Sequence, residues 1–202
     1  EDMKKPDWDD STQDDRLVES THSSVQAYRG ILLDVRKDTA RLPDRALSDR
    51  EWIKHPGACA VLPVFEDGTL MMIRQFRYPL RKVFLEVPAG KIDPGESILA
   101  TAERELAEET GVTATRLVHC GSFHPCIGYS DEVIHVFAAW DLKQDAHRMD
   151  DDEFLLPIRV PFTEALAYSR KGGIGDAKTM CSLELAADWW RREGPFDIGL
   201  DG

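Results

Sequence analysis

The stretch from Gly90 to Val112 constrains this chain more than any other, because it combines a glycine, a helix-forming run and closely spaced glutamates. It reads GKIDPGESILATAERELAEETGV. The run from about Ser97 to Thr110 predicts a helix, and Gly111 is expected to end it. The apolar stripe of this helix is formed by Ile98, Leu99, Ala102 and Leu106. Such a stripe anchors the helix on a core and leaves another face for polar chemistry.

That other face is acidic. Glu105, Glu108 and Glu109 are three and four residues apart, so their side chains share one side of the predicted helix. Three carboxylates on one surface repel each other unless a cation holds them. Oxygen ligands of this kind suit Mg²⁺ or Mn²⁺, which keep coordination positions open for phosphates and water. The alternative is an acidic helix face that is only solvated, as most Glu-rich stretches are.

The complete stretch matches the pattern G-x5-E-x7-R-E-U-x-E-E-x-G-U, in which U is a bulky aliphatic residue. The defined positions are filled by Gly90, Glu96, Arg104, Glu105, Leu106, Glu108, Glu109, Gly111 and Val112. This pattern is the Nudix box, so the chain resembles the Nudix hydrolases, and the full match outweighs the solvated-face alternative. The resemblance implies hydrolysis of a nucleoside diphosphate linked to another group.

The resemblance also implies roles for individual residues. Glu105 and Glu109 are the main metal ligands, Glu108 assists in metal binding and catalysis, and the carbonyl of Ala89 completes the site. Arg104 is implied to orient the glutamates by salt bridges and counts among the catalytic residues. A further box residue, Glu96, is implied to be structural. The expected cofactor is Mg²⁺, with Mn²⁺ as a substitute.

The segments that flank the box resemble the branch of the family that cleaves ADP-ribose and nucleotide sugars. These segments are HPGA (55–58), VLPV (61–64), IRQFRYPL (73–80), LEVPAGKIDPGE (85–96) and GYSDE (128–132). ADP-ribose pyrophosphatases typically have a proline at the position of Ile127, whereas the only proline of the HPCIGYSDE loop here is Pro125. A GDP- or UDP-sugar therefore remains an alternative substrate. A catalytically silent domain that senses a nucleotide sugar is a second alternative.

Cations are dense in one short segment, where Arg74, Arg77, Arg81 and Lys82 follow each other closely, with Arg50 upstream. In a chain with a net charge of −12, such a group can receive a pyrophosphate, since guanidinium groups bind phosphate oxygens bidentately. A basic exposed strand edge is the alternative. Arg50, Arg74 and Arg77 are therefore candidate substrate contacts. By resemblance, Glu51 contacts the base or ribose.

Carboxylates in the later loops complete the candidate residues. Glu132 is a candidate substrate contact. Related enzymes place a catalytic glutamate on a mobile loop before the last strand, and Glu153 in MDDDEFLLPIRV occupies that place. A base there could deprotonate the attacking water. An acidic loop that is only solvated is the alternative.

The order of strand-like and helix-like runs predicts an α/β fold, and the resemblance implies a Nudix α/β/α sandwich with a mixed sheet. Within it, ACAVLPVF and TLMMIRQFRY flank the turn signal Glu66-Asp67-Gly68 and predict a hairpin. The expected organisation is a flexible leader (1–20), a β-rich N-terminal element (21–54), the hydrolase domain (55–195) and a tail (196–202). In this branch the N-terminal element commonly exchanges between subunits, which implies a homodimer with Arg50 or Glu51 acting across the interface.

Charge, apolar runs and cysteine content indicate which partners and which cellular location to expect. With 25 Lys and Arg against 37 Asp and Glu, the chain is not expected to bind nucleic acid. No apolar run is long enough to cross a membrane. The four cysteines include no C-x-x-C pair, so reduced thiols are expected, with Cys59 and Cys181 packed in the core. Together these features predict a soluble, cytoplasmic protein.

Overall fold

The computed structural model describes residues 6, 9, 11–144 and 154–200. The chain forms two compact units. The first comprises Glu1–His55 with Gly128–Asp131, and the second comprises Pro56–Ile127 with Glu132–Gly202.

The first unit is an antiparallel sheet of three strands in the order β1-β2-β3, which confirms the predicted β-rich element. Its strands are β1 (Ser20–Arg29), β2 (Asp34–Arg41) and β3 (Leu47–Lys54), preceded by a short 3-10 helix (Asp14–Arg16). The loop segment Gly128–Asp131 joins this unit, since the amide of Ile53 donates to the carbonyl of Tyr129 at 2.8 Å. Among the described residues of this unit, Ala40 alone is buried. The sheet therefore has no hydrophobic core of its own.

The second unit contains two sheets. A mixed sheet has the order β7-β4-β9-β8, in which β4 and β9 run parallel and the other pairs are antiparallel. An antiparallel sheet has the order β10-β5-β6. Their bounds are β4 (Ala58–Pro63), β5 (Thr69–Arg77), β6 (Lys82–Glu86), β7 (Ala89–Lys91), β8 (Val112–Phe123), β9 (Ile134–Gln144) and β10 (Leu155–Pro161).

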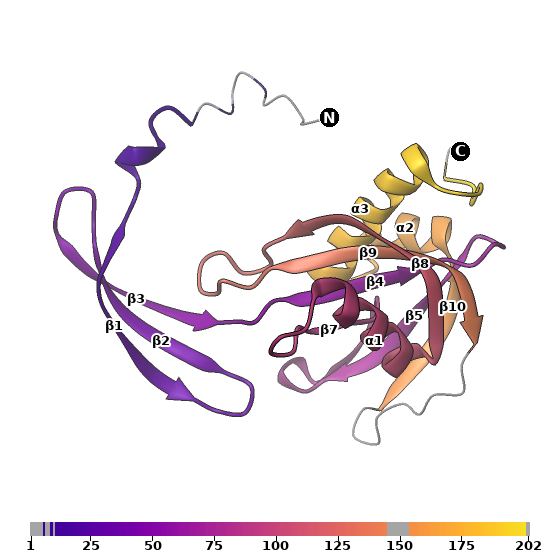
Figure 1. The fold of residues 1–202 in the computed structure, drawn as a ribbon, viewed down its shortest axis with the longest axis horizontal. Helices are drawn as coiled ribbons and strands as arrows, with labels where there is room; N and C mark the ends of the chain where they lie inside the picture. Colours follow the sequence, from indigo (N-terminus) through magenta and orange to yellow (C-terminus); the bar gives the residue numbers. More distant parts are fainter. Residues whose placement is uncertain (1–5, 7–8, 10, 145–153, 201–202) are drawn as a thin grey trace. The chain divides into compact units, whose positions relative to one another are not determined.

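Helices cover both faces of the mixed sheet (Figure 1). The helices are α1 (Ile98–Thr110), α2 (Phe162–Arg170) and α3 (Ala177–Glu193). Alternate residues of β4 belong to different hydrophobic clusters, because successive side chains of a strand point to opposite faces. Ala60 and Leu62 pack with α2 and α3, whereas Cys59 and Val61 pack with α1. Every residue of β4 is buried, as expected for a strand covered on both faces. The predicted α/β/α sandwich is confirmed.

Local signals explain the bounds of α1. The hydroxyl of Ser97 accepts a hydrogen bond from the amide of Ala100 at 3.1 Å and caps the first turn. Gly111 ends the helix with φ of 65°, a left-handed conformation that glycine adopts without strain. Leu106 is fully buried, whereas Leu99 is 45% exposed. The prediction that Leu99 belongs to the buried face of the helix is therefore wrong, because this residue of the first turn projects beyond the core.

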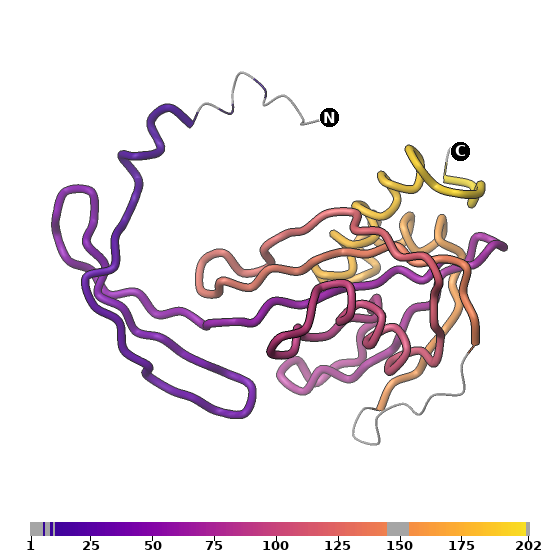
Figure 2. The backbone as a smooth tube through the Cα atoms, in the orientation of Figure 1, coloured from indigo at the N-terminus to yellow at the C-terminus, as the bar shows by residue number. Residues whose placement is uncertain are grey.

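The predicted hairpin of residues 58–78 is wrong. The chain makes a tight turn after β4, in which the amide of Phe65 donates to the carbonyl of Thr69 at 2.8 Å. Figure 2 shows this turn in purple, and beside it an isolated bridge joins Val64 and Leu70. β5 then pairs within the other sheet. The reason is that β4 already pairs with β7 on one edge and β9 on the other. β7 covers only Ala58–Ala60 of that edge, but both edges of β5 pair elsewhere, with β10 and β6, so the pairing of the two arms does not extend beyond the turn.

Two further expectations concern the cysteines and the C-terminal end. Cys59 is fully buried, as predicted, and burial raises the pKa of its thiol to about 12. Cys181 is exposed, because it lies on the solvent side of α3, so its assignment to the core is wrong.

After α3, the indole nitrogen of Trp190 donates to the carbonyl of Phe196 at 3.0 Å, and Ile198 is buried. The described helices include none long and apolar enough to cross a membrane.

Leu106 and Leu99 provide a matched test of how α1 is anchored. Leu106→Ala should lower the free energy of unfolding by about 2–5 kcal/mol, because it empties a fully packed site beneath α1. Leu99→Ala should cost less than about 1 kcal/mol, because Leu99 is 45% exposed and leaves no enclosed cavity when it is shortened. Urea unfolding followed by circular dichroism measures both. Equal losses for the two variants would contradict this packing.

Candidate active site

Two glutamates of α1 are buried, although carboxylates are rarely found inside proteins. Glu105 is 9% exposed and Glu109 is 4% exposed. A buried carboxylate is costly unless hydrogen bonds or cations compensate its charge. An oxygen of Glu109 accepts a hydrogen bond from the amide of Ala89 at 2.8 Å, and Glu105 accepts one from Arg104 at 2.6 Å. The acidic face of α1 is thus built into the protein and packed against β7.

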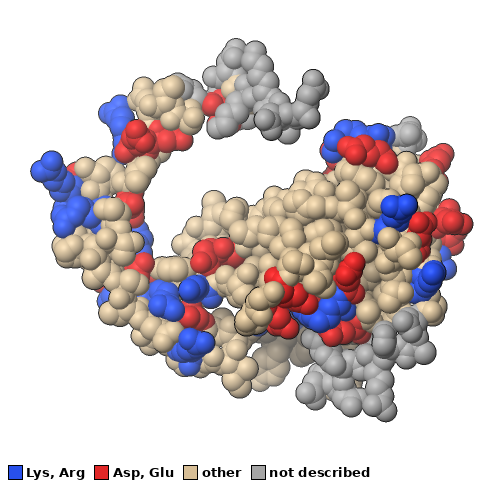
Figure 3. Space-filling view, viewed as in Figure 1, with Lys and Arg blue, Asp and Glu red and all other residues tan. Residues whose placement is uncertain are grey.

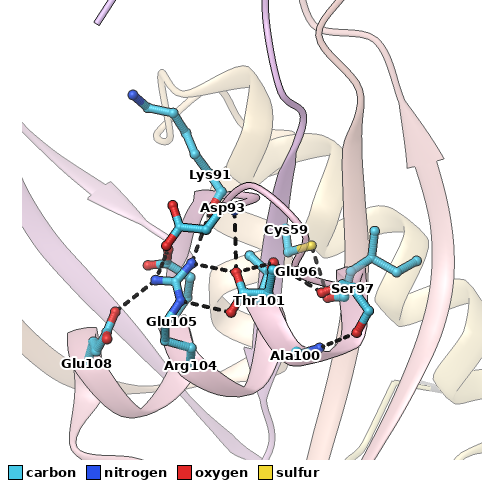
Figure 4. A network of polar contacts seen from close by, with 11 residues as sticks. Cys59, Lys91, Asp93, Glu96, Ser97, Ala100, Thr101, Arg104, Glu105 and Glu108 are labelled. Atoms are coloured by element: carbon cyan, nitrogen blue, oxygen red, sulfur yellow. Dashed lines mark hydrogen bonds and ion pairs between the residues drawn. The ribbon is translucent and has the colours of Figure 1, made fainter. Parts of the chain in front are cut away.

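Arg104 joins three carboxylates and one carbonyl (Figure 4). Nε and Nη2 donate to Glu96 at 3.1 Å, and Nη2 also donates to the carbonyl of Lys91 at 3.1 Å. Nη1 donates to Glu105 at 2.6 Å and to Glu108 at 2.9 Å. Hydrogen bonds to these carboxylates, led by Glu96, raise the pKa of Arg104 above its ordinary value. Acidic and basic side chains accordingly lie next to each other over α1 in Figure 3.

Glu96 fixes the loop before α1 to the helix. Besides the contact with Arg104, its carboxylate accepts hydrogen bonds from the Thr101 hydroxyl at 2.7 Å and the Asp93 amide at 3.4 Å. Arg104 and then Thr101 lower the pKa of Glu96 to about 2. The ionised form is therefore strongly favoured in the folded protein.

Gly90 lies where β7 comes closest to α1. A Cβ atom at this position would lie 1.9 Å from Oε1 of Glu105, which is far inside van der Waals contact. Only glycine lets the backbone approach the carboxylate without displacing it. This explains why the first position of the motif requires a glycine.

The chemistry of these groups fits a divalent cation. Glu105, Glu108, Glu109 and the Ala89 carbonyl supply only oxygen donors, which Mg²⁺ and Mn²⁺ prefer. Within the described ranges, no three His, Cys, Asp or Glu side chains are already arranged as metal ligands. Glu105 and Glu108 hydrogen-bond to Arg104, and Glu109 hydrogen-bonds to the Ala89 amide. The donor set fits a hard cation, and Arg104 offsets its negative charge.

Sequence reasoning missed a second ionic cluster beside this face. Its centre is Glu86, whose side chain is 2% exposed. Arg77 donates to both carboxylate oxygens of Glu86, at 2.8 and 2.6 Å, and Lys178 lies 3.2 Å from one of them. Glu86 is the main cause of the raised pKa of Arg77, with smaller contributions from Asp176 and Glu109. The available signal was a single glutamate, Glu86, within the otherwise apolar run VFLEV (83–87).

The structure does not bring the predicted cations together. Arg74 and Arg77 are three residues apart on β5, so strand alternation turns their side chains to opposite faces of the sheet. Arg77 faces Glu86 while Arg74 is exposed. The Arg81 guanidinium lies over the ring of Tyr78, 3.4 Å from its centre. The expected single group of cations is therefore split, because its prediction ignored the two-residue period of a strand.

The remaining candidates lie in different parts of the chain. Arg50 and Glu51 belong to β3 of the first unit, where Arg50 donates to both carboxylate oxygens of Glu19 at 2.9 and 2.6 Å. Glu132 belongs to the second unit and is partly buried. Glu153 lies outside the described residues.

Comparison with known proteins identifies relatives of this arrangement. Residues 54–182 match the family model described as the NUDIX domain. An ADP-ribose pyrophosphatase of Bacillus subtilis (strain 168) is 39% identical over 170 residues, which cover 83% of this chain and 92% of that protein. A methanol dehydrogenase activator of Bacillus methanolicus is 37% identical over 168 residues, covering 82% and 91%. The crystal structure of an ADP compounds hydrolase has the same fold, with a TM-score of 0.76 at 24% identity over 87% of this chain and 96% of that one.

The contact between Arg104 and Glu96 predicts a specific pH dependence. Glu96 has an ordinary pKa of 4.5 and a folded pKa of about 2, so folding favours its ionised form. Its contribution to stability is complete above about pH 4.5 and is lost as the pH falls towards 2. In Arg104→Gln the pKa of Glu96 should rise towards 4.5, because the variant removes the hydrogen bond that contributes most to lowering this pKa.

Carbon-13 NMR titration of the Glu96 carboxyl measures this shift. Arg116→Gln, which changes an exposed arginine of β8, serves as the control and should leave the pKa of Glu96 at about 2. A pKa that stays near 2 in Arg104→Gln would show that Thr101 and the backbone hold the carboxylate instead.

Proposed function

The chain belongs to the Nudix family, and from that premise we propose that it hydrolyses the pyrophosphate bond of ADP-ribose or of a related nucleoside diphosphate sugar. The products are a nucleoside monophosphate and a sugar phosphate. The observation that carries the proposal is the contact of Arg104 with three carboxylates of the Nudix box, at distances between 2.6 and 3.1 Å. Such an arrangement holds a concentrated negative charge in place for a cation and its bound phosphates.

Nudix hydrolases generally need divalent metal ions. We propose Mg²⁺ as the cofactor, with Mn²⁺ as a substitute, held by Glu105, Glu108, Glu109 and the Ala89 carbonyl. When bound, such a cation lowers the pKa of a coordinated water and neutralises charge on the phosphate oxygens. Arg104 orients Glu105 and Glu108, and the Ala89 amide orients Glu109. These contacts support a preorganised site.

Arg77 is the best-supported phosphate contact among the proposed substrate residues. A guanidinium has five N–H donors, and the hydrogen bonds of Nε and Nη2 to Glu86 use two of them. The remaining donors can bind phosphate oxygens, while Glu86 fixes the orientation of the group. Arg50, Glu51, Arg74 and Glu132 are also proposed to contact the substrate, and Glu153 is proposed as the general base.

The substrate assignment follows the Bacillus subtilis relative, which is named an ADP-ribose pyrophosphatase. Ile127, in place of the typical proline, keeps other nucleotide sugars as the second candidate class. A catalytically silent sensor is disfavoured, since a sensor has no need for Glu105 and Glu109 buried on one helix face at a cost in stability.

We further propose that the protein forms a homodimer through its first unit. This three-stranded sheet exposes several large apolar side chains, namely Val25, Tyr28, Ile31, Leu32 and Leu47. Exposed apolar surface on a sheet that lacks a core favours pairing with a second copy.

The net charge of −12 supports the absence of a nucleic-acid partner. The four free cysteines support a reducing location such as the cytoplasm.

Turnover of ADP-ribose, GDP-sugars and UDP-sugars in Mg²⁺ tests the proposed reaction, and is read as the inorganic phosphate that added alkaline phosphatase releases from the two monophosphate products. Glu109→Gln should lower kcat by at least about 100-fold, because it removes the charge of a proposed metal ligand. Glu103→Gln changes an exposed glutamate of the same helix and should retain activity. Binding of nucleotide sugars without turnover by the wild type would favour the sensor.

Light scattering coupled to size-exclusion chromatography tests the dimer. The wild type should have twice the mass of one chain, and the double variant Ile31→Asp/Leu32→Asp should be monomeric, because it charges the most exposed apolar turn of the first unit. Leu156→Asp changes an equally exposed leucine of the second unit and should remain dimeric. A monomer for Leu156→Asp alone would move the interface to the second unit.

A further inference from the structure

The Ala89 carbonyl is delivered to α1 by a short crossing between the two sheets of the second unit. The crossing consists of Val87 and Pro88, which connect β6 of one sheet to β7 of the other. Both residues are buried, and the residues after them, Ala89 and Gly90, lie against the carboxylates of α1. The position of the Ala89 carbonyl therefore depends on what holds this crossing.

Each end of the crossing is held by hydrogen bonds. The Val87 amide donates to the Thr179 hydroxyl at 3.0 Å, and the Val87 carbonyl accepts from the Lys178 ammonium at 3.2 Å. The Pro88 carbonyl accepts from the Val61 amide at 2.9 Å, and the Ala89 amide donates to Glu109 at 2.8 Å. Two of these bonds come from consecutive residues in the first turn of α3. A distant helix thus holds the crossing from the side opposite α1.

The side chain of Asp176 holds the first turn of α3 and orients the hydroxyl of Thr179. Asp176 caps the helix, accepting from the amides of Lys178 and Thr179 at 3.3 and 3.0 Å. It also accepts the proton of the Thr179 hydroxyl at 2.6 Å. A hydroxyl has one proton, so the oxygen of Thr179 is left as the acceptor for the Val87 amide. Asp176 therefore orients the group that holds Val87.

The contacts of Lys178 distinguish it from a substrate-binding cation. Its ammonium lies 3.2 Å from each of three acceptors, namely the Val87 carbonyl, Glu86 and Asp176. An ammonium has three N–H donors, so these acceptors engage its full capacity. The side chain is only 15% exposed. All three donors of Lys178 are therefore used within the protein, whereas Arg77, which also contacts Glu86, has a side chain that is 41% exposed.

We propose that Lys178 and Thr179 are positioning residues for the metal site, which act by fixing the Val87–Pro88 crossing and thereby the Ala89 carbonyl. This inference rests on the proposed function, in which that carbonyl is a metal ligand. It assigns the first turn of α3 a role in metal binding that the Nudix box does not include. Groups that orient a ligand typically change metal affinity by about 10- to 100-fold when they are removed.

The test is the Mn²⁺ dissociation constant of the full chain without substrate, measured by electron paramagnetic resonance of free Mn²⁺. Lys178→Met and Thr179→Val should each weaken binding by about 10- to 100-fold. Thr179→Ser keeps the hydroxyl and should bind Mn²⁺ like the wild type. Lys171→Met, which changes an exposed lysine after α2, is the matched control and should also bind normally.

Unchanged Mn²⁺ affinity in Lys178→Met and Thr179→Val would overturn the inference, even if both variants melt at lower temperature. A raised KM at saturating Mn²⁺ with unchanged metal affinity would also overturn it and assign Lys178 to substrate binding. If Lys178→Met does not fold, the comparison of Thr179→Val with Thr179→Ser still tests the inference. Equal Mn²⁺ affinities for these two variants would contradict it.

The wild type separates this inference from the proposed function. If the wild type binds Mn²⁺ but cleaves no nucleotide sugar, the proposed substrate is wrong and the comparison of variants still decides the role of Lys178 and Thr179. If the wild type binds no Mn²⁺, the metal site fails and the inference is overturned with it.

Discussion

The acidic face of α1 depends on one guanidinium. Glu105 and Glu109 are buried beside Glu108, and such carboxylates would repel each other and resist burial without compensation. Arg104 contacts Glu96, Glu105 and Glu108 together, and the Ala89 amide satisfies Glu109. Because Glu96 also binds Thr101 and the loop before α1, the same guanidinium ties the loop, the helix and β7 into one unit. The site's charge and its local fold are therefore inseparable.

The sandwich supplies the rigidity that this charge requires. Leu106 is fully buried against the cluster that contains Val61, so α1 is anchored on β4 through the residues between its glutamates. β4 in turn pairs with β7, which carries Gly90 against Glu105. Leu106 thus packs on β4 and Glu105 packs on β7, and these two strands are paired with each other. Both contacts oppose small movements of α1 relative to β7.

Local features of this arrangement could be predicted from the sequence, and distant contacts could not. The helix that starts near Ser97 and stops at Gly111 follows from local residue preferences, and the shared face of the glutamates follows from spacings of three and four residues. The split of Arg74 from Arg77 follows from an equally local period and could have been predicted. The contact of Thr179 with Val87 joins residues 92 positions apart, and only the packing of α3 on the sheet reveals it. The broken hairpin likewise depends on the strands that pair with β4 and with β5, which are distant in sequence.

Two of the three arginines proposed to contact the substrate, Arg50 and Arg77, differ in what phosphate binding would require. Arg50 uses Nε and Nη2 for Glu19, an exposed partner, and Nη1 for Ser48 and a carbonyl, so a phosphate must compete with exchangeable surface contacts. Arg77 is held by Glu86, which is buried and also neutralised by Lys178. The charges of Arg77 and Lys178 are balanced by Glu86 and Asp176, so Arg77 contributes oriented N–H donors near Glu109 rather than excess positive charge. This favours Arg77 as a preoriented phosphate contact beside the carboxylate helix.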